Sequence, residues 1–245
     1  MTRSFGDGCG CFPTGRHYAG IAHLLRTVVR GVVEGISPDV PWQEIEIALL
    51  DVETTGRDAS VDRVVEVGVV VGRGGEILRK DNWLINPGIP IPPEVSAIHH
   101  ITNEMVKDAP RFEDVAAEIA GALRGAVPAA YNAPFDRAFM MSEFSRAQAD
   151  TSSIGALARD VEWIDPLIWA RHIQADEKSR ALGDVAARLG VSLENAHRAE
   201  DDAAAALRVL YALGRNPRVP RAYGALLQQQ RSLAQSQAAA RRTWR

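Results

Sequence analysis

The sequence contains no apolar run near the length of about 18 residues that a membrane-spanning helix requires. Its first residues, MTRSFGDGCGCFPTG, also lack the apolar stretch of a secretory signal peptide. These two absences exclude a membrane partner and favour a cytoplasmic protein. The 245 residues are 46% apolar, which is enough for one globular domain with a full core and short appended segments.

Cysteine is scarce, since only Cys9 and Cys11 occur, and both lie in a glycine-rich leader. A structural zinc site needs about four ligands, so these two would have to combine with the nearby His17 and His23. We interpret the leader instead as a segment with reduced thiols.

Basic residues are in deficit where a nucleic-acid-binding protein would normally carry an excess. Residues 46–214 hold 17 Lys and Arg against 27 Asp and Glu, whereas residues 215–245 hold 7 Arg and no acid. If the central segment acts on nucleic acid, bound divalent cations must offset its charge. We interpret the Arg-rich segment as a solvated tail that adds unspecific attraction to phosphates.

The hydrophobic pattern predicts an α/β domain between two appended segments. An amphipathic helix is expected at 17–36, within an extension spanning 1–45. The domain, 46–214, begins with three segments typical of strands joined by tight turns, within 45–56, 64–71 and 76–85. Helices are then expected at 112–123, 134–147, 166–173, 180–189 and 199–213, and further strands at 127–132 and 161–166. The order predicts a mixed five-stranded sheet, with an antiparallel meander, parallel strands and helices on both faces.

Two acids end the first predicted strand of this domain. Asp51 and Glu53 are two residues apart, so their side chains point to the same side. Adjacent carboxylates repel each other unless a cation neutralises them, and Mg²⁺ or Mn²⁺ prefers such oxygen ligands. The alternative is a strand that runs into solvent with two harmless acids.

A second group of chemically active residues is HRAEDD, at the start of the predicted helix 199–213. Glu200, Asp201 and Asp202 lie in the first turn of this helix. Acids in a first helical turn interact favourably with the helix dipole, which is the purely structural explanation for all three. Asp202, however, lies on the stripe that faces the core, whereas Asp201 does not. The core-facing stripe consists of Ala206, Val209 and Leu213. An inward carboxylate needs a partner, and His197 beside it could accept a proton near neutral pH.

The segment YNAPFDRAF provides a third candidate. Asn132 ends a predicted strand, and Asp136 lies in the first turn of the helix that follows. Ligands of α/β proteins collect at the carboxyl ends of strands. A helix-capping role is the alternative for Asp136.

In this order, ALLDVETTG, YNAPFDRAF and HRAEDD resemble the three motifs of the DnaQ-like (DEDDh) exonuclease superfamily. The segment EVSAIHHIT resembles the family's intervening sequence, with His99 at its histidine and His100 at its usual glycine. Tyr131 stands where many members carry histidine. Neither departure falls on a metal ligand of the family, but either could alter specificity for the end of the chain.

The resemblance implies a ribonuclease H-like fold and a metal-dependent 3′→5′ exonuclease that releases nucleoside 5′-monophosphates. It implies two divalent metal ions, Mg²⁺ or Mn²⁺, and single-stranded 3′ ends as partner, DNA more than RNA. By this resemblance His197 is the base, and the metal ligands are Asp51, Glu53, Asp136 and Asp202. The same reasoning assigns substrate binding to Thr54, Thr55, Gly56, His99, Asn132 and Phe135.

Three other functions are alternatives to a DNA exonuclease. The enzyme could be an exoribonuclease, since no feature of the sequence senses a 2′-OH. It could be an accessory subunit of a DNA polymerase or sliding clamp, because QQQRSLAQ weakly resembles a clamp-binding peptide with Gln230 and Leu233. A phosphatase with an aspartyl nucleophile is disfavoured, because Asp51-Val52-Glu53 departs from its Asp-x-Asp pattern.

Overall fold

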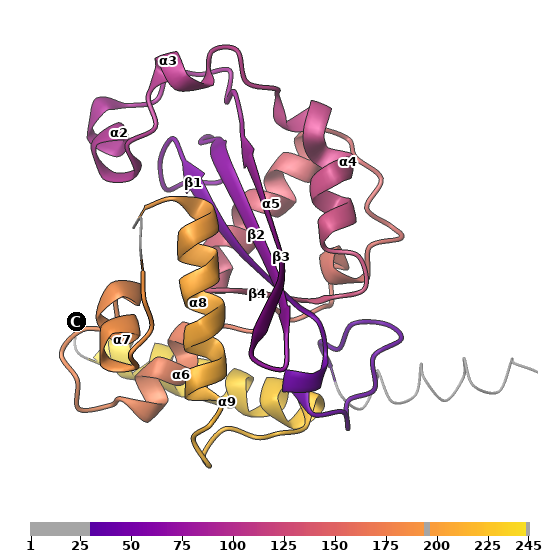
Figure 1. The fold of residues 1–245 in the computed structure, drawn as a ribbon, viewed down its shortest axis with the longest axis vertical. Helices are drawn as coiled ribbons and strands as arrows, with labels where there is room; N and C mark the ends of the chain where they lie inside the picture. Colours follow the sequence, from indigo (N-terminus) through magenta and orange to yellow (C-terminus); the bar gives the residue numbers. More distant parts are fainter. Residues whose placement is uncertain (1–29, 194–196, 244–245) are drawn as a thin grey trace, which may run out of the picture.

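A computed structural model describes residues 30–193 and 197–243, which form a sheet covered by helices on both faces (Figure 1). The sheet of the described chain has four strands in the order β3-β2-β1-β4. Their bounds are β1 Ile47–Thr54, β2 Val64–Arg73, β3 Glu76–Leu84 and β4 Val127–Ala130. The first three pair antiparallel and β4 joins β1 in parallel, which confirms the predicted meander and mixed sheet.

The described chain has eight α-helices, of which the five between residues 112 and 213 agree with the predicted ranges and the other three were not predicted. They are α2 Pro93–His99, α3 Asn103–Val106, α4 Phe112–Ala122, α5 Ala133–Arg146, α6 Pro166–Ile173, α7 Leu182–Arg188, α8 Ala199–Leu213 and α9 Tyr223–Thr243. Two short 3-10 helices, η1 Trp42–Glu44 and η2 Gly155–Leu157, accompany them.

Alternation along the central strands builds a separate core on each face of the sheet. Ile47 and Leu49 of β1 pack with α6, α7, α8 and α9. Ala48, Leu50 and Val52 pack with α4 and α5 on the other face. The direction of every β1 side chain is thereby fixed. Within the described chain, no helix is both long and apolar enough to cross a membrane.

The prediction of a fifth strand at 161–166 is wrong. This segment makes only one isolated parallel bridge, between Ala129 and Ile164. Two hydrogen bonds form it, from Ile164 N–H to the Pro128 carbonyl and from Ala130 N–H to the Ile164 carbonyl. The next donors of a parallel ladder would be the N–H groups of Pro128 and Pro166, which proline lacks. The two prolines therefore stop the ladder after a single bridge.

The Arg-rich C-terminal segment is folded, contrary to the expected solvated tail. It forms α9, in which Tyr223, Leu226 and Leu227 are completely buried. Gln230, which belongs to the segment with a weak resemblance to a clamp-binding peptide, is also buried and hydrogen-bonds to main-chain groups of Trp163 and Asp165.

The segment before the domain packs against this C-terminal helix. Most of the predicted helix 17–36 lies outside the described residues, but its end, 30–36, forms turns rather than helix. The following chain pairs with the start of α9 through hydrogen bonds from Tyr223 N–H to the Val40 carbonyl and from Trp42 N–H to the Arg221 carbonyl. The described parts of both flanking segments, from residue 30 and up to residue 243, are thus part of the packed fold.

Candidate active site

Asp51 and Glu53 lie on the face of β1 that α8 covers. They continue the alternation of Ile47 and Leu49, whose side chains belong to the core beneath α8. The apolar first half of the strand fixes its register in the sheet, so the two carboxylates must emerge on the same side at its end.

Glycine in the neighbouring strand lets α8 approach these carboxylates. Gly68 of β2 is the cross-strand partner of Asp51. A Cβ added at Gly68 would lie 2.3 Å from the carbonyl carbon of Ala199, the first residue of α8. The missing side chain therefore allows the N-terminus of α8 to rest on the sheet directly beside Asp51.

Glu66, also in β2, fixes the start of α8. Its buried carboxylate accepts hydrogen bonds from the Ala199 N–H at 3.0 Å and from Arg198 Nη2 at 2.6 Å. Asn82 Nδ2 donates a further bond at 3.0 Å. Burial would raise the pKa of Glu66, but the hydrogen bonds from Arg198, Asn82 and Ala199 hold it below its ordinary value.

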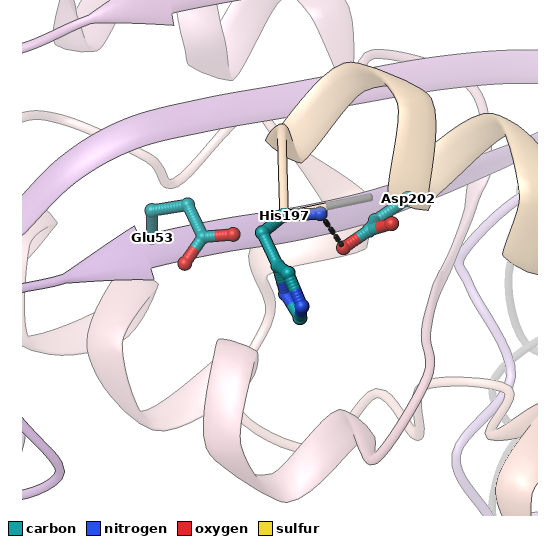
Figure 2. Close-up of side chains that lie close together, drawn as sticks. All are labelled: Glu53, His197 and Asp202. Atoms are coloured by element: carbon teal, nitrogen blue, oxygen red, sulfur yellow. Dashed lines mark hydrogen bonds between the residues drawn. The ribbon is translucent and has the colours of Figure 1, made fainter. Parts of the chain in front are cut away.

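Approach of α8 brings His197 and Asp202 to Glu53. One ligand atom of each of these three side chains lies within 4.8 Å of the others. The His197 N–H donates to Asp202 Oδ2 at 3.1 Å, and His197 adopts a left-handed conformation with φ 69°. Figure 2 shows the carboxylates of Glu53 and Asp202 on either side of His197, both directed toward it.

Asp136 enters from the first turn of α5, on the opposite side of β1. It is 3% exposed, and its Oδ1 accepts a hydrogen bond from the Val52 N–H at 3.1 Å. This contact ties the N-terminus of α5 to the main chain between Asp51 and Glu53. Asp136 also acts electrostatically on both of these acids.

The gathered carboxylates are poorly compensated by the protein itself. Burial raises the pKa of Asp51 well above its ordinary value, and repulsion from the carboxylates of Asp136, Glu53, Asp202 and Glu66 raises it further. Burial, followed by repulsion from Asp202 and Glu66, raises the pKa of Glu53 to about 8. Burial likewise raises the pKa values of Asp136 and Asp202, although hydrogen bonds to the Val52 N–H and the His197 N–H oppose this.

A divalent cation fits this donor set. Asp202 Oδ1 is buried and has no hydrogen-bond partner in the described chain, so one of its oxygens remains available as a ligand. Glu53, His197 and Asp202 form a compact group of oxygen and nitrogen donors. The raised carboxylate pKa values are those expected where a cation belongs.

The residues expected to bind substrate differ in how far they are buried and in what they contact. Thr54 and Thr55 are buried, and the Thr54 hydroxyl donates to the Gly56 carbonyl. At Gly56, an added Cβ would lie 2.3 Å from Asp62 Oδ2, so a larger residue would have to displace the Asp62 carboxylate. Phe135 is half-buried, with its ring 4.9 Å from that of Phe139 between centroids, so it contributes to the core.

His99 and Asn132 differ from each other in exposure. His99, at the end of α2, is buried, and its Nδ1 accepts from the Ile101 N–H at 3.0 Å. Burial lowers its pKa, and the Thr54 carbonyl opposes that effect, which puts His99 close to the first motif. Asn132 is exposed at the start of α5, in a left-handed conformation with φ 74°.

The two departures from the family pattern have clear structural settings. His100 has φ 61° and terminates α2, which explains why glycine is usual at this position. The hydroxyl of Tyr131 donates to the Arg180 carbonyl at 2.6 Å and so contributes to local packing.

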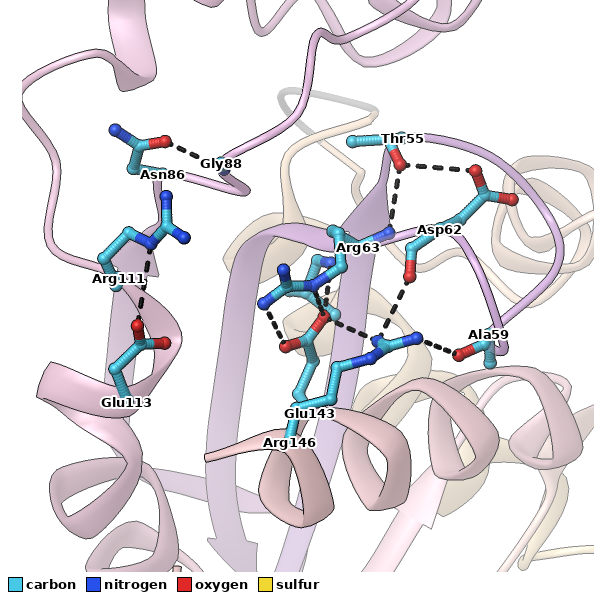
Figure 3. Close-up of polar contacts among 11 residues, drawn as sticks. Thr55, Ala59, Asp62, Arg63, Asn86, Gly88, Arg111, Glu113, Glu143 and Arg146 are labelled. Carbon is cyan, nitrogen blue, oxygen red and sulfur yellow. Dashed lines mark hydrogen bonds and ion pairs between the residues drawn. The ribbon is translucent and has the colours of Figure 1, made fainter. Parts of the chain in front are cut away.

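The loop after β1 is fixed by α5 (Figure 3). Buried Glu143 accepts two hydrogen bonds from Arg63, at 2.7 and 2.9 Å, and one from Arg146 at 3.1 Å. Arg146 also donates to the carbonyls of Ala59 and Asp62. Helix α5 therefore carries Asp136 in its first turn, and its last turns hold the loop that contains Thr55 and Gly56.

Glu66, Gly68 and Glu143 were not predicted from the sequence as residues that shape the site. Glu66 had a visible signal, because it is the one charged residue inside the apolar run VVEVGVVV. Gly68 lies in the same run, where glycine often marks close approach of another backbone. No local pattern distinguishes Glu143 from the exposed acids of an ordinary helix.

Comparison with known proteins shows similarity to one protein family. Residues 49–210 match the family described as Exonuclease (RNase_T). The chain is 32% identical to the DNA polymerase III subunit epsilon of Treponema pallidum over 163 residues, covering 66% of this chain and 73% of that protein. It is 29% identical to the 3′-5′ exonuclease DinG of Staphylococcus aureus over 163 residues, 66% of this chain but only 17% of that protein.

The fold is also found in a solved structure of exonuclease X in complex with 5′ overhanging duplex DNA. The TM-score is 0.56 at 23% sequence identity, and the alignment covers 74% of this chain and 98% of the other. The chain therefore belongs to the DnaQ-like exonuclease family, whose members remove nucleotides from the ends of nucleic-acid chains.

Proposed function

We propose that this protein is a 3′→5′ exonuclease that hydrolyses the terminal phosphodiester of single-stranded DNA and releases nucleoside 5′-monophosphates. The observation that carries the proposal is the convergence of Glu53, His197 and Asp202 beside two further carboxylates from separate elements. Glu53 lies 144 residues before His197 in the sequence, yet the two side chains and Asp202 form one cluster. Neither helix capping nor solvent exposure explains such a cluster.

Asp51, Glu53, Asp136 and Asp202 would hold two divalent cations, Mg²⁺ or Mn²⁺. When bound, the cations would supply positive charge that allows a negative phosphodiester to approach this acidic site and that makes water easier to deprotonate. His197 takes the proton of the attacking water as its oxygen bonds to the terminal phosphorus, and the bond from phosphorus to the 3′ oxygen breaks. The leaving oxygen takes up a proton from solvent.

The related proteins support the choice of DNA and of the 3′ end. The Treponema relative is a subunit of a DNA polymerase, and the Staphylococcus relative is called a 3′-5′ exonuclease. The structural neighbour was solved with duplex DNA that has a 5′ overhang. Recognition of a free end would involve Thr54, Thr55 and Gly56, with His99 near Thr54, and Asn132 at the start of α5.

The test is trimming of a single-stranded oligonucleotide labelled at its 5′ end, with Mg²⁺, Mn²⁺ or chelator present. We expect a ladder of products shortened from the 3′ end, and nucleoside 5′-monophosphates by chromatography. A phosphorothioate at the terminal 3′ linkage should block the reaction, and a matched RNA should be cut more slowly. His197→Ala should lower kcat by about 10²–10⁴-fold, the usual contribution of a general base.

Asp201 provides a matched control, because it adjoins Asp202 in the same turn of α8. Asp202→Asn should abolish trimming, whereas Asp201→Asn should retain it. Equal trimming by wild type and Asp202→Asn would refute the site, and shortening from the 5′ end would refute the polarity.

A further inference from the structure

We propose that Glu66 is a positioning residue that sets the place of His197, acting through Arg198 and the N-terminus of α8. The inference rests on the proposed function for its catalytic consequence. Its structural content, a carboxylate in β2 that anchors the chain segment next to the proposed base, stands separately.

Glu66 binds the two residues that immediately follow His197. Its Oε1 accepts from Arg198 Nη2 at 2.6 Å and from Arg198 Nε at 3.2 Å, and its Oε2 accepts from the Ala199 N–H at 3.0 Å. Asn82 of β3 donates to Oε1 at 3.0 Å, so Glu66 itself is held by the neighbouring strand. The side chain of Glu66 is fully buried.

These contacts matter because His197 has an unfavourable main-chain conformation. Its φ of 69° lies in the left-handed region, which is strained for residues other than glycine and persists only where the surrounding contacts hold it. On its C-terminal side the enforcing contacts are those of Arg198 and Ala199 with Glu66. The hydrogen bond from His197 N–H to Asp202 completes the turn.

Glu66 lies where a further metal ligand could be expected, but hydrogen bonds already occupy both of its carboxylate oxygens. It lies directly across from Glu53 in the antiparallel pairing of β1 and β2, and therefore borders the acidic cluster. A carboxylate offers about four acceptor sites, and donors from Arg198, Asn82 and Ala199 already use them. We therefore assign Glu66 the role of orienting Arg198 and Ala199, and not of binding a metal ion.

The experiment combines Glu66→Gln with His197→Ala in the full-length protein. Glutamine keeps the size of the side chain but loses the charge and one acceptor. In the wild-type background we expect kcat for oligonucleotide trimming to fall by about 10–100-fold, with KM changed by less than about twofold. In the His197→Ala background the same substitution should change kcat by less than about twofold, because the group that it positions is already gone.

Glu162→Gln is the matched control, since Glu162 pairs with Arg231 of α9 at 2.6 Å and is not part of the site. It should leave kcat within about twofold of wild type in both backgrounds. If Glu66→Gln does not fold, Arg198→Ala replaces it, because the Arg198 side chain is 45% exposed and its removal opens no cavity in the core. The same dependence on His197 is expected.

Amide hydrogen exchange of His197 and Ala199 in the Mg²⁺-loaded protein separates this proposal from the proposed function. Glu66→Gln should accelerate exchange at both amides by about tenfold or more, while Glu162→Gln does not. If wild type cuts no nucleic acid, the proposed function fails, and the exchange result alone decides the role of Glu66. Unchanged exchange, or equal losses of kcat with and without His197, would overturn the positioning role.

Discussion

At the scale of single residues, Asp51 shows why this site requires a cation. Four carboxylates raise its pKa in addition to burial, and among the described contacts only that of Glu66 has an arginine bonded to it. The charged form of the cluster is therefore disfavoured in the folded protein unless positive charge is added. The same residues that would bind the metal destabilise the metal-free protein.

This conflict predicts how the stability of the metal-free protein depends on pH. The pKa of Glu53 is about 8 in the folded state against an ordinary 4.5, so the folded state retains a proton that the unfolded state has released. Between these pH values the unfolding free energy must fall as pH rises. With chelator present, we expect the melting temperature to be several degrees lower at pH 8 than at pH 5.5. The pKa shifts of Asp51, Asp136 and Asp202 act in the same direction.

Glu53→Gln isolates this contribution from all other titrating groups. Thermal melts of the variant in chelator should decline less between pH 5.5 and pH 8 than those of wild type. Added Mg²⁺ should raise the melting temperature of wild type more at pH 8 than at pH 5.5, because the ligands must lose their protons to bind it. Parallel pH profiles for wild type and variant would contradict the raised pKa.

At the scale of elements, the site depends on how closely α8 lies on the sheet. Gly68→Ala would place a Cβ 2.3 Å from the main chain of Ala199, where no flexible side chain can yield. We expect α8 to be displaced from β2, with a loss of about 1–3 kcal/mol of unfolding free energy, the usual cost of overpacking. Denaturant unfolding measures this loss, and trimming activity should fall with it.

Gly121→Ala is the matched control for that substitution. Gly121 lies inside α4, and a Cβ there meets no atom within 4 Å. Alanine should stabilise the helix by about 0.5–1 kcal/mol. A Gly68→Ala protein as stable and as active as Gly121→Ala would show that α8 does not need this close approach.

Elements with a strong local pattern were predictable from the sequence, and contacts between distant segments were not. The alternation of β1 and the core stripe of α8 placed Asp51, Glu53 and Asp202 on facing surfaces, as observed. The segment 161–166 has the composition of a strand, but its pairing fails because Pro128 and Pro166 cannot donate to the ladder.

Glu66 illustrates what sequence patterns cannot supply. Its partner Arg198 is 132 residues away along the chain, and nothing in either segment indicates the other. The core-facing position of Asp202 beside His197 identified the pair, but the anchoring of that turn depends on the contact between β2 and the start of α8. Residues that orient others tend to escape motifs for this reason.

At the scale of the whole molecule, the catalytic fold is enclosed by segments that the sequence suggested were appendages. The ring of Trp42 stacks on that of Tyr211 at 5.8 Å between centroids, joining the N-terminal segment to α8. Gln230 of α9 receives the Asp165 N–H, and the Asp165 carboxylate in turn accepts from the Asn132 N–H at the start of α5. A chain of hydrogen bonds thus runs from the C-terminal helix to the element that carries Asp136.

The division at residue 214 can be tested by truncation. A chain ending there loses Tyr223, Leu226 and Leu227, each of which contributes about 1.5–3 kcal/mol through burial. The sum approaches the whole stability of about 5–15 kcal/mol that is typical of a domain. We therefore expect the 1–214 chain to be largely unfolded or to melt more than about 15 °C below the full chain by circular dichroism.

A chain ending at Gln237 is the control, because it keeps the buried part of α9 and removes the exposed Arg241 and Arg242. Its melting temperature should equal that of the full chain within about 2 °C. Gln230→Ala should lie between the two, since it leaves the Asp165 N–H and the Trp163 carbonyl buried without partners, at about 1–3 kcal/mol each. If the 1–214 chain instead melts with the full-length protein, α9 is a dispensable tail, and the hydrogen bonds from Gln230 do not support the site.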